Sequence, residues 1–159
     1  MVMEKARPHL ESLSRLAPQL NKATDLYVDE LKEIEKELNK LNLGTAVELS
    51  AWIETGNSKT EYDDDGEAVG VFYDAWTLGY GKDDRGEWHL LIRKYKVPSV
   101  PSGTYPNPQD ILEEDTTPLL QASRDLRIAA AEKIPDLLKK IEEKVKKKIG
   151  LLAKVSDKR

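Results

Sequence analysis

Cysteine is absent from this sequence of 159 residues, and there are only two histidines, two methionines and one phenylalanine. Without cysteine there is no disulfide framework, no thiol nucleophile and no cysteine ligand for a metal ion. No apolar run approaches the roughly 20 residues that a membrane-spanning helix needs, and residues 1–8 lack the apolar run of a signal peptide. These absences predict a soluble, cytoplasmic protein with no membrane partner.

Charge, in contrast, is abundant and unevenly distributed. Charged residues make up 34% of the chain against 39% apolar residues, a balance that favours elongated helices over a large core. The net charge is −4, yet nine Lys and Arg residues accompany only three acids from Lys139 onward. A basic end on an acidic body either binds an anionic partner or pairs with the protein's own acidic surface.

The N-terminal region carries an apolar heptad pattern, which predicts a helical arm over residues 8–43. Such spacing makes one apolar stripe, and the stripe must be buried against another element. Pro18 interrupts it, so either a short helix ends near Ala17 and a second begins, or one helix continues with a kink. Gly44 is a typical stop. The stripe comprises Leu10, Leu13, Ala17, Leu20, Thr24, Tyr27, Leu31, Ile34, Leu38 and Leu41.

From Thr45 the apolar period changes to two, which is typical of half-buried strands. The connections are short and contain no helix, so an antiparallel meander of three strands is expected within residues 45–97. The strands are expected at residues 45–54, 69–79 and 87–96, joined by a polar loop at 56–66 and a tight turn at 82–86.

Residues 98–117 contain four prolines, which predicts an extended connection without regular structure. A second helical arm is expected over residues 118–155, with Pro135 as an interruption. The predicted fold is therefore α+β: a small three-stranded antiparallel meander flanked by two long, proline-interrupted amphipathic arms, in one domain of residues 1–159. The two stripes are expected to pack as an antiparallel pair. A homodimer with a four-helix contact would complete their burial, and the alternative is a monomer whose sheet covers them.

Aromatic side chains gather in the meander. Together with nearby arginine, an exposed aromatic face could stack bases or hold a peptide. The interpretation that we favour is that Trp76 and Trp88 are cross-strand partners supporting a small sheet. The candidate ligand-binding or partner-binding residues here are Trp76, Tyr80, Trp88 and Arg93.

Two arginines of the second arm are further binding candidates. On a helix, Arg124 and Arg127 lie on one face beside the apolar stripe. We expect them to pair with Asp74 or Glu48 across the helix–sheet interface, with anion binding as the alternative.

The C-terminal arm ends in a basic stretch that includes Lys144, Lys146, Lys147 and Lys148. These lysines could contact nucleic-acid phosphates or an acidic membrane surface. Lysine near a helix C-terminus also stabilises the helix dipole without any partner. Because the sequence pI is about 5.4, nucleic-acid binding is not the favoured hypothesis.

No pattern in the chain indicates catalysis, a cofactor or a metal site. His9 and His89 lack the neighbouring ligands that a zinc site needs, and His89 is expected on the sheet surface. The acidic run 63–67 lacks the ligand spacing of a calcium loop and is expected to be a solvated hairpin tip. Neither a phosphate-binding glycine loop nor a nucleophile elbow is present.

Several blocks of the chain resemble a recurring pattern in uncharacterised bacterial proteins. The blocks are Leu16–Asp25, Leu41–Gly44, Leu78–Lys82 with Trp88, and Ala122–Leu138. The resemblance implies a shared helix–β-meander–helix design and carries no activity with it.

These features predict a non-enzymatic interaction or assembly protein that self-associates through its helical arms as a homodimer and has room for a further protein partner. The first alternative is a nucleic-acid-associated factor that uses the basic C-terminal helix. The second alternative is a small-ligand or peptide binder on the aromatic sheet face.

Overall fold

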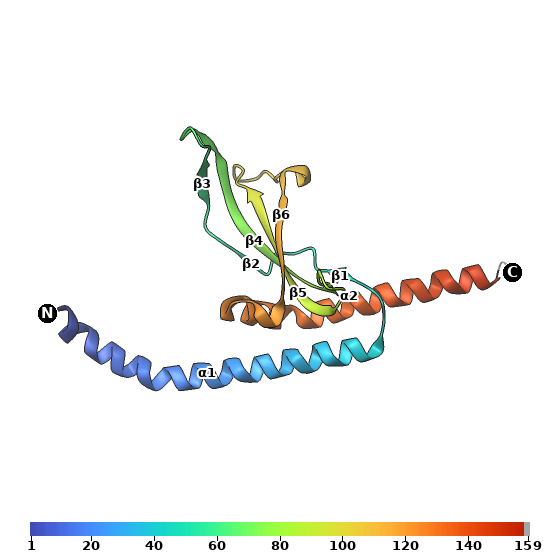
Figure 1. Cartoon of the computed structure of the whole chain (residues 1–159), viewed down its shortest axis with the longest axis horizontal. Coiled ribbons are helices and arrows are strands. Elements are labelled where there is room, and N and C mark those ends of the chain that lie inside the picture. Colours follow the sequence, from blue (N-terminus) through green and yellow to red (C-terminus); the bar gives the residue numbers. More distant parts are fainter. Residues whose placement is uncertain (158–159) are drawn as a thin grey trace.

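The chain forms two long helices that flank an antiparallel sheet of six strands, as seen in a computed structural model that describes residues 1–157 (Figure 1). The α+β class is confirmed. The elements are the helices α1 (Val2–Leu41) and α2 (Arg124–Asp157), the strands β1 (Val47–Glu48), β2 (Glu54–Thr55), β3 (Lys59–Tyr62), β4 (Ala68–Lys82), β5 (Trp88–Pro98) and β6 (Leu112–Pro118), and the 3₁₀ helices η1 (Pro108–Asp110) and η2 (Leu119–Gln121).

The sheet is built on the long β4–β5 hairpin, in register from Phe72 opposite Pro98 to Lys82 opposite Trp88. Strand β6 pairs with the outer edge of β5. Strands β1, β2 and β3 follow one another along the outer edge of β4, and all pairings are antiparallel. The expected meander is thus present as β4–β5–β6. The segment predicted as its first strand contributes only the short β1 and β2.

Two strands form where none was expected. Strand β3 lies inside the predicted loop 56–66, because the hairpin that leads into β4 is longer than its polar composition indicates. Strand β6 lies at the end of the predicted irregular connection 98–117 and includes Pro118, the first residue of the predicted second arm. The prolines of that connection stop at Pro108, and the next is Pro118, the last residue of β6. A proline at the end of an edge strand does not interrupt the hydrogen-bond ladder.

Both helices continue through their prolines, so the kinked-helix alternative is the one found for α1. Pro18 lies within α1, and Pro135 lies within α2. Both side chains are exposed. Each proline therefore costs one intrahelical hydrogen bond on the solvent side, where the helix can curve away from its ring. The N-terminal half of α1 is visibly curved (Figure 1).

The two helices run in the same direction, so the predicted antiparallel pairing is wrong (Figure 1). Arg124, at the start of α2, donates to the Oδ1 of Asn21 in the middle of α1 at 2.9 Å, and Leu38 lies with Ile141 further along. The sheet separates the helices in sequence, and β6 returns the chain to the middle of α1. The pair is therefore staggered. Residues 2–20 of α1 extend beyond α2 at one end, and the last turns of α2 extend beyond α1 at the other (Figure 1).

The core lies between the helices and one face of the sheet. Its fully buried side chains come from both helices, from the β4–β5 hairpin and from η2. Within residues 1–157, neither helix has an apolar stretch of the length that a bilayer crossing needs. The core residues include Leu31, Leu38, Leu78, Tyr80, Leu90, Ile92, Leu119, Ile134, Leu137 and Ile141.

Candidate functional site

The tight turn between β4 and β5 is organised by one carboxylate. The Oδ1 of Asp83 accepts the backbone N–H groups of Arg85 and Glu87, both at 2.9 Å, and Gly86 has a positive φ of 80°. A side-chain acceptor at the first residue and glycine at the left-handed position are typical of such turns. The expected turn is confirmed, one residue later than predicted. The second carboxylate oxygen of Asp83 remains available for other contacts.

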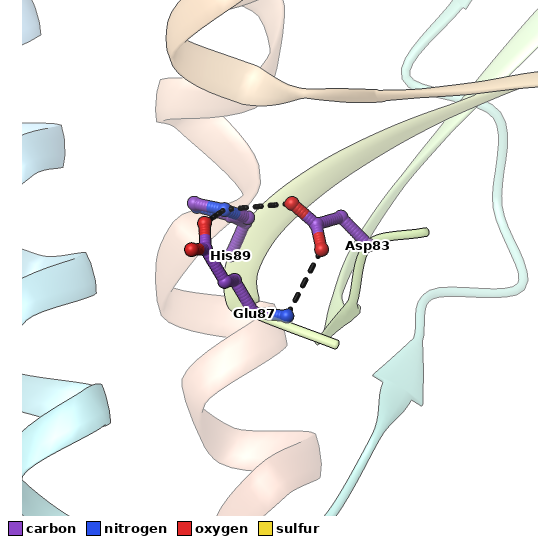
Figure 2. Close-up of side chains that lie close together, drawn as sticks. All are labelled: Asp83, Glu87 and His89. Atoms are coloured by element: carbon purple, nitrogen blue, oxygen red, sulfur yellow. Dashed lines mark hydrogen bonds and ion pairs between the residues drawn. The ribbon is translucent and has the colours of Figure 1, made fainter. Parts of the chain in front are cut away.

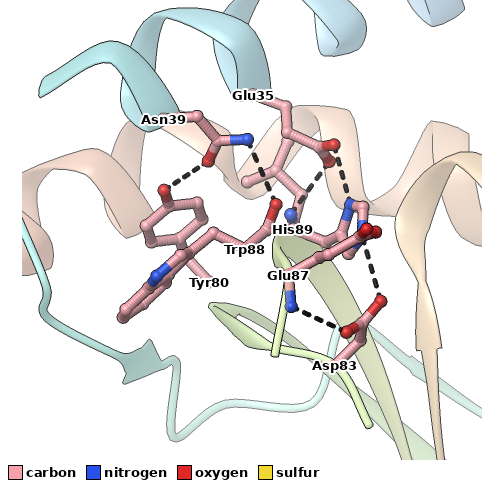
Figure 3. Close-up of polar contacts among 8 residues, drawn as sticks. Glu35, Asn39, Tyr80, Asp83, Glu87, Trp88 and His89 are labelled. Carbon is pink, nitrogen blue, oxygen red and sulfur yellow. Dashed lines mark hydrogen bonds and ion pairs between the residues drawn. The ribbon is translucent and has the colours of Figure 1, made fainter. Parts of the chain in front are cut away.

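His89 lies just beyond this turn, with its imidazole between three carboxylates (Figures 2 and 3). Its Nδ1 lies 2.9 Å from the Oε1 of Glu35, in α1. Its Nε2 lies 3.1 Å from the Oδ2 of Asp83 and 3.6 Å from the Oε2 of Glu87. His89 was expected on the sheet surface, but only 24% of its side chain is exposed, because α1 crosses the sheet edge beside it.

Glu35 is a buried carboxylate that caps the edge of β5. Its Oε2 accepts the backbone N–H of Leu90 at 3.0 Å (Figure 3). Strand β6 ends at Pro118, opposite Leu91, so beyond that point no strand within residues 1–157 pairs with the outer side of β5. An unpaired backbone N–H here would cost free energy, and Glu35 supplies the missing acceptor.

One turn further along α1, Asn39 makes a second connection to the sheet. Its Oδ1 accepts the hydroxyl of Tyr80 at 2.6 Å, and its Nδ2 donates to the carbonyl of Trp88 at 3.1 Å (Figure 3). Glu35 and Asn39 are four residues apart and therefore share one helix face. Together they fix α1 along the edge of the β4–β5 hairpin.

The carboxylates around His89 shift the ionisation of the cluster. Burial alone lowers the pKa of His89, but the hydrogen bond and charge of Glu35, together with Asp83 and Glu87, outweigh it and raise that pKa above its ordinary value. The pKa of Asp83 lies below its ordinary value, chiefly because the backbone N–H of Glu87 donates to it, with Arg85 and His89 adding to the effect. The cluster therefore favours a positive charge at the imidazole.

The cluster borders a polar hollow of about 520 Å³ between the β4–β5 turn and β6. Its wall also includes Arg93, Glu113 and Thr116. Arg93 also lines an adjoining hollow of about 270 Å³, whose floor includes Gly79 and Gly81. The carboxylate of Glu48 accepts from Arg93 there at 2.8 Å. Polar groups thus converge on the sheet face that lies opposite the helices.

Comparison with protein-family models, with curated proteins and with solved structures finds no match for this chain.

The aromatic candidates lie on the sheet face that packs against the helices. Tyr80 is buried and stacks on Trp88, with ring centroids 5.2 Å apart, and Trp76 packs against the core. The predicted cross-strand pair of Trp76 and Trp88 is wrong: Trp76 lies opposite Lys94, and Trp88 lies opposite Lys82. The inference that aromatic residues support the sheet applies instead to Tyr80 and Trp88.

Neither arginine of α2 makes its predicted ion pair. Arg124 donates to Asn21, and Arg127 donates to the carbonyl of Ala122 at 3.0 Å. Both predicted acceptors have other partners. Glu48 pairs with Arg93, and Asp74 lies 3.7 Å from Lys94, because strand neighbours reach these carboxylates more directly than α2 does.

The basic stretch of α2 divides into two sets. Lys144 and Lys148, with Lys140, point at the edge of the sheet, where their Nζ atoms donate to oxygen atoms of residues 44–48. Lys146 pairs with Glu142 on the same helix at 2.9 Å, and both it and Lys147 are exposed. Half of the predicted basic tail is thus bound within the protein.

The sequence interpretation missed Glu35, Asp83 and Glu87 as neighbours of His89. A signal for the two turn residues was present, because the runs 63–67 and 83–87 share the pattern Asp-Asp-x-Gly-Glu. For Glu35 the signal is its spacing, four residues after Leu31 and three before Leu38, which places it on the buried face of α1.

Proposed function

We propose that this chain is a non-enzymatic assembly protein that self-associates through the N-terminal part of α1, residues 2–20, here called the overhang. The observation that supports this proposal is that the apolar stripe of α1 is buried by the rest of the protein over only half of its length. Thr24, Leu31 and Leu38 are buried, whereas Leu10 and Leu20, on the same stripe, are 50% and 49% exposed. An apolar stripe that continues past its partner helix is typical of an interaction surface.

The residues that flank the stripe support contact with a protein surface. Beside the buried half lie Glu30 and Glu37, one heptad apart. The equivalent positions in the overhang are His9 and Leu16, and Leu16 is also about half exposed. The overhang therefore has a broader apolar face and fewer charges at its contact edges than the rest of α1. A wide face of this kind suits a helical bundle.

A second copy of the same overhang is the occupant that the charges favour. Residues 2–20 hold three basic and two acidic residues, so two overhangs repel one another little. The uncovered end of α2 is a poorer partner, because residues 146–157 hold four lysines and one aspartate. Two overhangs that pack about a two-fold axis also give a closed dimer, whereas head-to-tail contacts between α1 and α2 would give rings or open filaments.

Sedimentation velocity at tens of micromolar tests the proposal. We expect a dimer for the natural chain and a monomer for Leu10→Glu/Leu13→Glu, which places two charges on the stripe. The matched control is Ser12→Glu/Gln19→Glu, which adds the same charges to the other side of the helix and should remain dimeric. A natural chain that sediments as a monomer, or a stripe variant that dimerises as well as the control, contradicts the proposal.

The lack of cysteine allows a test of orientation. Single-cysteine variants Met3→Cys and Leu20→Cys are mixed and oxidised. Antiparallel overhangs bring position 3 of one chain close to position 20 of the other, so the mixed disulfide should predominate. Predominance of the two symmetric disulfides would exclude the two-fold antiparallel arrangement.

A further inference from the structure

We propose that Asp83, Glu87 and His89 form a binding site for one divalent transition-metal ion of the Zn²⁺ class. Such a site lies apart from the overhang and is independent of the proposed self-association. The three residues line one end of the polar hollow beside the β4–β5 turn (Figure 2). One nitrogen and two oxygen atoms, one from each side chain, all lie within 4.8 Å of one another.

The direction of the histidine ring leaves a place for a metal ion at this point. Glu35 lies against Nδ1, and a carboxylate can only accept, so Nδ1 carries a proton. In the neutral imidazole, Nε2 then presents its lone pair to the carboxylates of Asp83 and Glu87. Three electron-rich atoms then converge, and a proton or a metal ion between them removes the repulsion.

The spacing of the three atoms suits a metal ion. Zinc binds nitrogen and oxygen ligands at about 2.0–2.2 Å, so two ligands at a tetrahedral angle lie about 3.4 Å apart. The Nε2 atom of His89 lies 3.1 Å from the Oδ2 of Asp83 and 3.6 Å from the Oε2 of Glu87, on either side of that value. The third pair, the two carboxylate oxygens, lies within 4.8 Å, and the exposed Glu87 side chain can move to complete the geometry.

The surroundings hold two of the ligands in place. Histidine ligands of metal ions commonly donate their second ring N–H to a carboxylate, and the buried Glu35 fills this role for His89. The Oδ1 of Asp83 is fixed by two backbone N–H groups of the turn, so its Oδ2 is aimed at the imidazole. Glu35 is accordingly a positioning residue and not a ligand.

The chain contains an internal comparison for this site. In the β3–β4 turn, the Oδ1 of Asp63 accepts the N–H groups of Asp65 and Glu67 at 3.0 and 2.8 Å, as Asp83 does in the β4–β5 turn. There Val69 stands where the second turn has His89. Turn geometry thus accounts for the aspartate and the glutamate in both places. It does not account for the imidazole or for the buried carboxylate behind it.

The ligand set indicates which ions bind. Imidazole nitrogen favours Zn²⁺ and its transition-metal neighbours, whereas Mg²⁺ and Ca²⁺ favour sites made of oxygen alone. With three protein ligands, a fourth position remains for water from the hollow.

Calorimetric titration of the full chain with ZnCl₂, with MgCl₂ as the comparison, tests the site. We expect one Zn²⁺ per chain, no heat of binding with MgCl₂ at the same concentrations, and at least tenfold weaker Zn²⁺ binding in Glu87→Gln and in His89→Gln. The matched controls are Glu67→Gln, at the same position of the other turn, and His9→Gln, the only other histidine; both should bind as the natural chain does. Glu87 is 67% exposed, so Glu87→Gln should fold normally.

Two outcomes would overturn the proposed metal site. If the natural chain shows no Zn²⁺ binding while the ¹⁵N chemical shifts of His89 report a doubly protonated ring, a proton alone occupies the position. Zn²⁺ binding that survives in both His89→Gln and Glu87→Gln, or that His9→Gln abolishes, also refutes it. Glu35→Gln should weaken Zn²⁺ binding about 10–100-fold. It should also alter the ¹⁵N shift of Nδ1 in the loaded protein, which a general loss of stability would not do.

Discussion

The Nζ of Lys144 lies 2.6 Å from the carbonyl oxygen of Ala46, on the outer edge of the sheet. The same contact recurs one helical turn to either side, from Lys140 to the carbonyl of Glu48 at 2.6 Å and from Lys148 to the carbonyl of Gly44 at 3.5 Å. Four residues of a helix rise about 6 Å, and two residues of a strand span about 6.6 Å, so the two repeats match. The row of lysines therefore satisfies an edge that β-strands of other molecules could otherwise extend.

The first prediction concerns this row. Lys144→Met keeps the aliphatic stem but leaves the carbonyl of Ala46 without its donor, so the free energy of unfolding should fall by about 1 kcal/mol. Lys147→Met, on the exposed side of the same helix, should change it by about 0.5 kcal/mol or less. Urea denaturation measures both, and equal effects would show that the contact with Ala46 contributes nothing.

A second prediction concerns the buried carboxylate of α1. Glu35→Ala leaves the N–H of Leu90 without an acceptor and His89 without its Nδ1 partner, and should lower the free energy of unfolding by about 2–3 kcal/mol. The exposed Glu33, half a turn away on α1, provides the control, and Glu33→Ala should be nearly neutral. Hydrogen exchange of the Leu90 amide should also accelerate in Glu35→Ala and stay unchanged in Glu33→Ala.

A third prediction distinguishes the two glycines near the end of β4. A Cβ at Gly79 would lie 2.9 Å from the carbonyl oxygen of Val47, a backbone atom that cannot move without displacing β1. Gly79→Ala should therefore cost about 1–3 kcal/mol. A Cβ at Gly81 meets only side-chain atoms at ordinary contact distances, the Cδ1 of Leu91 at 3.4 Å and the Cβ of Ala46 at 3.6 Å, so Gly81→Ala should be close to neutral. Thermal unfolding of the two variants tests the difference, and equal melting temperatures would count against it.

A fourth prediction concerns the hydroxyl of the buried tyrosine. Tyr80→Phe removes the 2.6 Å bond to Asn39 and should lower the free energy of unfolding by about 1–1.5 kcal/mol. Tyr62→Phe, at a side chain that is 65% exposed, should have no measurable effect. Guanidinium denaturation, followed by tryptophan fluorescence, compares the two. If Tyr80→Phe is as stable as the natural chain, α1 is held to the sheet by packing alone.

Periodicity identified the helices and the two long strands, because each is long enough for its apolar repeat to be unambiguous. It did not identify β3, whose four residues are all exposed and carry no apolar alternation. Nor did it identify β6, whose first four residues are exposed and whose flanking segments are rich in proline. Helix direction also escaped prediction. The two apolar stripes predict that the helices pack together, but they do not predict in which direction. The path of β6 places Arg124, the first residue of α2, beside Asn21 of α1.

The candidate site shows a different limit. Asp83 and Glu87 lie in a turn that the sequence predicts from its Asp-Asp-x-Gly-Glu pattern. Glu35 is separated from His89 by 54 residues, and only the crossing of α1 over the end of β5 brings them together. Glu35 differs from the exposed acids of α1 because it lies on the buried face of the helix, and only the folded protein shows that this face meets His89.

The β3–β4 and β4–β5 turns share one sequence pattern and one set of hydrogen bonds, so the chain contains two equivalent loops that can be exchanged. The segments 63–67 and 83–87 present the same backbone hydrogen bonds, from Gly66 to Asp63 and from Gly86 to Asp83, both at 3.0 Å. Either five-residue segment should be exchangeable for the other without rebuilding its hairpin. The residue two positions after each segment, Val69 or His89, then determines which side chain lies beside the turn.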